Sequence, residues 1–245
     1  MIAEPAAQQR LLQLAEIDTE LGRIEHRRRA MPELAEVAEA EKAVRARKDA
    51  VTEVETAAGD LDRDIARLER DVDGVRARAR RDQGLLATGS VPAKQAVDLQ
   101  HELETLARRQ GVLEDELLEI MEQREATGAN LDNARVELEA AERTLADAAE
   151  RRTTAVADLD ANEAGRRRDR EAAVGDLPAD LLGLYDKLRE QTGTGAALLR
   201  ARRCGACRLE LDTSEVSAVK AAPANAVVRH EECGVIMVRT SESGL

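Results

Sequence analysis

The sequence predicts a mainly α-helical fold, in which a long antiparallel coiled-coil hairpin precedes a small β-rich module at the C-terminal end. Two observations lead to this expectation. Apolar residues recur at alternating steps of three and four over most of the chain, and short strand-like stretches surround the three cysteines near the C-terminus. Composition agrees, because 35% of residues are charged and Tyr185 is the only residue among Phe, Trp and Tyr. This mixture suits long helices with a narrow apolar stripe rather than a thick core.

The first arm of the hairpin is defined by an apolar seam that begins at Leu14. A three-residue step from Val51 to Val54 predicts a local change of register, and Pro32 is expected to kink or break the helix near its start. The seam residues of this arm are Leu14, Ile17, Leu21, Ile24, Met31, Leu34, Val37, Val44, Val51, Val54, Ala58, Leu61, Ile65, Leu68, Val72 and Val75.

The second arm keeps the heptad pattern more strictly, from Leu99 to Leu159. Polar residues at the seam positions Gln110, Arg124 and Arg152 are expected to fix the alignment of the arms, with a partner site as the alternative. Residues 83–92 contain helix breakers and are predicted to form the hairpin tip. Because the two arms are nearly equal in length, they can pair within one chain. The hairpin domain is therefore predicted to span residues 1–175.

A second domain, residues 176–245, is predicted to consist of a short docking helix and the β-rich module. Gly175 and Pro178 separate the long helix from a shorter one, which is expected from Ala179 to about Gln191. Its apolar face contains Leu181, Leu184, Tyr185 and Leu188 and requires a surface to pack against. Tyr185 is therefore interpreted as a packing residue.

The chemistry of the chain is concentrated in two pairs of metal-binding side chains. Cys204 and Cys207 are separated by two residues, as are His230 and Cys233, and 22 residues lie between the pairs. Each pair, here called a knuckle, can grip one ion from a tight turn, and two knuckles supply the four tetrahedral positions that Zn²⁺ accepts. One structural Zn²⁺ is therefore predicted. A redox pair at Cys204 and Cys207 is disfavoured because a second knuckle is present and a thioredoxin-like βαβ pattern is missing.

Short strands are predicted around the knuckles at residues 209–211, 226–229 and 235–239. Asp212 with Glu215 has the pattern that caps a brief helix. Short strands around two such knuckles are typical of a zinc ribbon. So small a module buries little apolar area, and its fold is expected to depend on the metal.

Charge and hydropathy limit the functional classes. The formal net charge of −12 disfavours broad attachment to nucleic acid or to an anionic membrane. No signal segment and no apolar run of membrane-spanning length is visible, so a cytoplasmic protein without a membrane partner is expected. No nucleophile, phosphate loop or open metal site is identifiable, which predicts a protein that is not an enzyme.

The order of these parts resembles the bacterial coiled-coil C4-type zinc-ribbon family. The resemblance rests on the stretch from Val91 to Glu104 after the tip and on the terminal knuckles, and it covers nearly the whole chain. It implies a non-catalytic adaptor, with roles in RNA binding or in chaperoning export and flagellar components. The chain departs from the four-cysteine pattern at His230, which stands where the first cysteine of the second knuckle is expected.

Two functions remain open at this stage. The first is an adaptor that presents the tip and the ribbon to a protein partner. The second is RNA or DNA binding through basic residues around the knuckles, which would be directed at the nucleic-acid backbone because no aromatic platform exists. The sequence leaves the oligomeric state open. The candidate nucleic-acid contacts are Arg200, Arg202, Arg203, Arg208 and Arg229.

Overall fold

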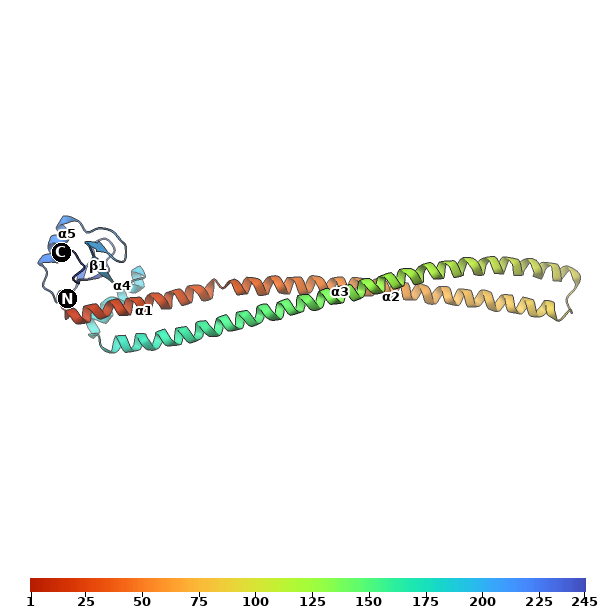
Figure 1. Cartoon of the computed structure of the whole chain (residues 1–245), viewed down its shortest axis with the longest axis horizontal. Helices are drawn as coiled ribbons and strands as arrows, with labels where there is room; N and C mark the ends of the chain where they lie inside the picture. Colours follow the sequence, from red (N-terminus) through yellow and green to blue (C-terminus); the bar gives the residue numbers. More distant parts are fainter. The chain divides into compact units, whose positions relative to one another are not determined.

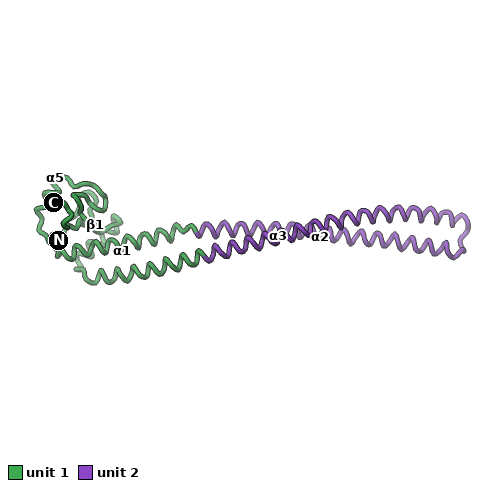
Figure 2. Tube along the Cα trace, in the orientation of Figure 1, with its two compact units in different colours: residues 1–32, 151–245 green, residues 33–150 purple.

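The structure is a computed structural model that describes residues 1–245. It contains five helices and four short strands, and contacts divide it into two compact units (Figure 1, Figure 2). One unit comprises residues 33–150, and the other joins residues 1–32 to residues 151–245. None of the helices is long and apolar enough for a membrane crossing. The elements are α1 (Pro5–Arg29), α2 (Pro32–Ala87), α3 (Ala93–Gly175), α4 (Ala179–Thr192), β1 (Ala196–Arg200), β2 (Arg203–Cys204), α5 (Thr213–Ala221), β3 (Val228–Arg229) and β4 (Ile236–Val238).

The predicted helical hairpin is confirmed. In the unit of residues 33–150, α2 and α3 lie side by side and antiparallel (Figure 2). The ion pairs between them follow this direction, since residue numbers fall along α3 as they rise along α2. Arg47 contacts Glu137 at 2.6 Å, and Arg76 contacts Glu114 at 2.6 Å. These exposed pairs fix the register more than they stabilise the unit.

One polar seam residue on α3 also bridges the arms, whereas Gln110 donates to Glu114 within α3. Arg124, a predicted seam residue, donates to Asp62 on α2 at 2.7 Å, which supports an alignment role. Leu34 was expected in the seam but is 47% exposed, whereas Ala40 is buried. The reason is that α1 ends at Arg29 and α2 begins anew at Pro32, so the helical phase set by α1 is not carried into α2.

The tip is a turn formed by residues 88–92 between α2 and α3. Helix α2 continues to Ala87, beyond the first residue of the predicted tip, and Gly89 then adopts a positive φ of 65°. The Thr88 hydroxyl donates to the Leu85 carbonyl at 2.7 Å. The side chains of Leu85 and Val97, which flank this turn, are 47% and 52% exposed.

The other unit has a core in which α1, α4 and the sheet meet. Leu11 and Leu14 of α1 pack with Leu181 and Tyr185 of α4, and with Ile236 of β4. Tyr185 is fully buried, as its interpretation as a packing residue requires. Gly195 is needed beside it, because a Cβ there would lie 2.5 Å from the Tyr185 backbone oxygen and 2.5 Å from its ring.

The small sheet has the strand order β2-β1-β4-β3, with β1 parallel to β4 and the other pairs antiparallel. Strand β1 was missed at the sequence level. Its residues do not alternate between apolar and polar, because Ala196 packs toward α1 and α4 while Leu199 packs in the ribbon core. The expected strand at 209–211 is wrong. Only a single bridge joins Glu210 to Arg203, since β2 has just two residues.

Candidate metal centre

The two predicted knuckles lie at neighbouring turns of the ribbon. Cys204 ends β2, and the second knuckle connects β3 to β4. Both turns close in the same way: the Arg208 amide donates to the Cys204 carbonyl and the Gly234 amide donates to the His230 carbonyl, each at 2.8 Å. The two halves of the site are therefore built from equivalent backbone turns.

The structure brings all four predicted metal-binding side chains together. One ligand atom from each of Cys204, Cys207, His230 and Cys233 lies within 4.8 Å of the others. The sulfurs of Cys204 and Cys233 are 3.8 Å apart, and His230 Nδ1 lies 3.4 Å from the Cys207 sulfur and 3.1 Å from the Cys233 sulfur. Ordinary Zn–S and Zn–N lengths imply edges of about 3.8 Å between sulfurs and about 3.6 Å between sulfur and nitrogen in a tetrahedron. The side chains fit one structural Zn²⁺.

The pKa values of the thiols Cys207 and Cys233 are shifted in opposite directions. Burial raises the pKa of Cys233 to about 11, and the neighbouring thiols Cys207 and Cys204 add to this increase. Burial also acts on Cys207, but hydrogen bonds from the Leu209 backbone and from the other two cysteines outweigh it, and the net pKa of Cys207 is lowered. Because a bound metal requires thiolates, it would displace the protons that these groups hold without it.

His230 faces the sulfurs with one nitrogen and an acidic residue with the other. Its side chain is 1% exposed, and Nε2 lies 3.8 Å from a carboxylate oxygen of Glu215. Glu215 was interpreted from sequence only as part of a helix cap, together with Asp212. The cap is present, since Asp212 accepts the Glu215 amide at 2.8 Å. The position of the Glu215 side chain beside His230 depends on tertiary folding, and the sequence carried no signal for it.

Four of the five arginines predicted to contact nucleic acid interact with their own chain. Arg200 pairs with Glu242 at 3.1 Å and Arg203 pairs with Glu210 at 2.8 Å. Arg202 donates to the Gly244 carbonyl at 2.9 Å, and Arg229 donates to the Gly234 carbonyl at 2.8 Å. Arg208 is exposed and its side chain makes no hydrogen bond or ion pair.

A second polar cluster lies where α1, α3 and α4 meet. Asp18 is buried and accepts hydrogen bonds from the Tyr185 hydroxyl and from Arg170, both at 2.8 Å, with Arg189 at 3.3 Å. Burial and the hydrogen bond to Asp18 raise the pKa of Tyr185 above its ordinary value. This network fastens α4 to the helices.

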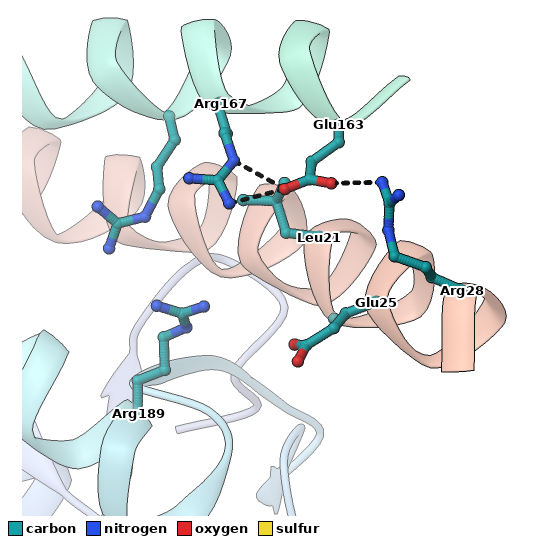
Figure 3. Close-up of a pocket in the computed structure, with 8 residues that line it drawn as sticks. Leu21, Glu25, Arg28, Glu163, Arg167 and Arg189 are labelled. Carbon is teal, nitrogen blue, oxygen red and sulfur yellow. Dashed lines mark hydrogen bonds and ion pairs between the residues drawn. The ribbon is translucent and has the colours of Figure 1, made fainter. Parts of the chain in front are cut away.

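Next to this network, a cavity of about 470 Å³ is lined by arginines and glutamates (Figure 3). Glu163 lies between Arg28 and Arg167 and accepts from both, at 2.8 Å and 2.7 Å (Figure 3). Arg167 belongs to a run of three arginines, and its neighbour Arg166 pairs with Glu20 at 3.1 Å. The arginines here chiefly join helices to one another.

Comparison with known proteins agrees with this construction. The CT398-like coiled coil hairpin domain matches residues 14–193, and the C4-type zinc ribbon domain matches residues 203–237. An uncharacterized protein of Mycobacterium tuberculosis is 40% identical over 239 residues, which cover 98% of each chain. Another from Mycobacterium leprae is 34% identical over 232 residues, which cover 92% of this chain and 97% of its own.

Solved structures show the same fold. A protein from Mycobacterium smegmatis with 38% identity aligns over 98% of this chain and 100% of its own, with a TM-score of 0.85. CT398 from Chlamydia trachomatis has 18% identity and a TM-score of 0.63 over 95% of this chain and 97% of its own. At this identity the similarity is one of fold. The chain therefore belongs to the family built from a CT398-like coiled-coil hairpin and a C4-type zinc ribbon, with His230 at one of the four positions of its metal centre.

Proposed function

We propose that the protein is a non-enzymatic adaptor whose zinc ion fixes a surface for a protein partner on the first knuckle. One observation carries this proposal. Immediately after Cys207, an arginine without a partner and a leucine that is 52% exposed, Arg208 and Leu209, stand next to each other on a constrained turn. A large apolar side chain beside a free guanidinium is the kind of pair that protein interfaces use as an anchor.

The backbone under this pair is held tightly. The Arg208 amide donates to the Cys204 carbonyl at 2.8 Å, and the Cys204 amide donates to the Leu209 carbonyl at 2.9 Å. Both bonds involve a predicted metal ligand, so binding of the metal orders Arg208 and Leu209 as well. A partner then meets a preorganised surface and loses less entropy on binding.

Arg208 also occupies a strained position. Its φ is 65°, close to the 73° of Gly234 at the equivalent place in the second knuckle. A residue other than glycine in this region costs about 1 kcal/mol. Its side chain forms no hydrogen bond or ion pair within the protein that offsets this cost, which supports a role in contacts with another molecule.

The hairpin tip supplies a second candidate surface. Leu85 and Val97 are exposed on either side of the turn at residues 88–92. The matching partner is a protein with apolar pockets and, at the ribbon, a carboxylate for Arg208. A cytoplasmic location belongs to this proposal, because a reducing compartment keeps Cys204, Cys207 and Cys233 available for metal.

A crosslinking pull-down with the full chain, with and without nuclease, tests the adaptor function. Leu209→Ser should remove most nuclease-resistant partners, and zinc removal should do the same. Leu118→Ser is the matched control, because Leu118 is 59% exposed on α3 and belongs to neither candidate surface, so the partners should persist in this variant. Full retention of the nuclease-resistant partners, both in Leu209→Ser and after zinc removal, would contradict the proposal.

Nucleic-acid binding is the second candidate function, and the free side chain of Arg208 is the observation that favours it. Titration of single-stranded RNA at low salt separates the two functions. Arg208→Gly removes the charge while keeping a residue suited to positive φ, so it should weaken either kind of binding. Leu209→Ser should weaken protein binding only. RNA affinity that falls severalfold with Arg208→Gly and is unaffected by Leu209→Ser would favour the second function over the first.

A further inference from the structure

Glu215 occupies an unusual position for an acidic residue. It lies in the first turn of α5, and its side chain is only 8% exposed. One carboxylate oxygen accepts the backbone amide of Glu231 at 2.9 Å, and the other faces His230 Nε2 at 3.8 Å. A buried carboxylate is unfavourable unless nearby groups compensate its charge. The compensating groups here are both in the second knuckle.

His230 requires such a neighbour. Its Nδ1 lies among the sulfurs, at 3.1 Å from Cys233 and 3.4 Å from Cys207, so Nδ1 is the nitrogen that faces the metal position. The proton of the neutral imidazole then belongs on Nε2. That nitrogen belongs to a side chain that is only 1% exposed, and the Glu215 carboxylate at 3.8 Å is too far for a hydrogen bond but close enough to attract a protonated Nε2. Glu215 is the acidic group that faces it.

A cysteine at position 230 would not need Glu215. A thiolate has no second atom to be oriented, and a buried carboxylate near it would add a repulsive negative charge. The approach of the second Glu215 carboxylate oxygen to position 230 is therefore favourable with a histidine and unfavourable with a thiolate. Outer carboxylates that hold a metal-bound imidazole orient the ring and make it a better ligand.

We propose that Glu215 is a positioning residue of the metal centre, which holds the His230 ring with Nε2 protonated and Nδ1 toward the zinc ion. In this way Glu215 allows histidine to serve where a C4-type ribbon has cysteine. This inference concerns the metal centre alone and does not depend on the adaptor function. The competing explanation is that Glu215 merely joins α5 to the second knuckle through the Glu231 amide.

Zinc affinity of the full chain, measured by competition with a chelator, distinguishes these explanations. Glu215→Gln keeps an oxygen for the Glu231 amide but removes the charge that faces His230. It should weaken zinc binding about tenfold. Glu231→Gln is the matched control, because it removes one exposed acidic charge from the same knuckle, and it should change the affinity by less than about twofold.

The same substitution in a His230→Cys background completes the test. There Glu215→Gln should leave zinc affinity unchanged or improve it, because no imidazole remains to be positioned. An equal loss in both backgrounds would show that Glu215 acts only as a structural link. No loss in the His230 background would also overturn the proposal.

A measurement on the unmutated protein gives an independent answer. In the zinc-loaded full chain, nitrogen NMR of the histidine rings should show His230 with a metal-bound Nδ1 and a protonated Nε2. Glu215→Gln should speed the exchange of that Nε2 proton with water. A His230 ring bound to the metal through Nε2 would overturn the proposal, since Glu215 could not then face the protonated nitrogen.

Discussion

Replacement of Tyr185 by Phe tests how the docking helix α4 is fastened. The Tyr185 hydroxyl is buried and donates to Asp18 at 2.8 Å, and the Asp18 side chain is only 4% exposed. A hydrogen bond to a charged, buried acceptor contributes about 1.5–3 kcal/mol. Asp18 keeps Arg170 at 2.8 Å and Arg189 at 3.3 Å, so its charge remains compensated in the variant. The expected loss is therefore near the lower end, about 2 kcal/mol.

Hydrogen exchange followed by mass spectrometry measures this loss where it occurs. A destabilisation of about 2 kcal/mol corresponds to about thirtyfold faster exchange. We expect this change in the amides of α4, residues 179–192, under conditions in which exchange follows local opening. Peptides from residues 33–150 serve as the internal control and should not change. Unchanged exchange in α4, or an equal change in both units, would refute the assignment of the Tyr185–Asp18 bond as the fastening of α4.

Three further predictions concern the same unit. Gly195→Ala should lower the thermal stability of this unit by several degrees in calorimetry, because the new Cβ would lie 2.5 Å from Tyr185 atoms. Gly183→Ala is the control and should not destabilise the unit, because a Cβ at the exposed Gly183 would meet no atom within 4 Å. Arg239→Lys should lower the stability of the ribbon against urea by about 3 kcal/mol, because a lysine ammonium group cannot reproduce the forked donors of the guanidinium. Arg239 donates to the carbonyls of Val219, Ala222, Pro223, Ala224 and Ala226. An unchanged midpoint of urea unfolding would contradict this role. The folded state raises the pKa of Tyr185, so its stabilising effect is complete below the unfolded pKa of about 10 and declines as pH rises above it. Tyrosinate absorbance should therefore appear only together with unfolding, and a separate titration near pH 10 in the folded protein would argue against the buried hydrogen bond.

The helical hairpin was predictable because its signal is long and periodic. Many heptads repeat the same apolar steps, and Pro32 and Pro178 mark helix boundaries that the structure confirms. Leu34 was misplaced because the phase of a heptad cannot be followed through a helix break. Ion pairs such as Arg124 with Asp62 could be suspected from the polar seam position, but the identity of the partner follows only from the register of the two arms.

The metal-binding cluster was predictable for a different reason. The spacing of Cys204, Cys207, His230 and Cys233 reflects the tight turn that each pair needs, so local sequence encodes it. The surroundings of the cluster were not encoded locally. Glu215 reaches His230 only after α5 packs against the second knuckle, and β1 shows no alternation because both of its faces are covered. The arginines could be named from sequence, but only the folded chain shows which of them pair internally.

The zinc content of the full chain is the most direct test of the metal centre. Elemental analysis of protein purified without added metal should give about one zinc ion per chain, because four protein side chains fill the tetrahedron. Cys204→Ser should lower this content sharply, because it removes one of the four ligands, whose sulfur lies 3.8 Å from that of Cys233. A chain that contains no zinc when pure, or a Cys204→Ser variant that binds zinc as tightly as the unmutated protein, would contradict the assignment of a structural zinc ribbon.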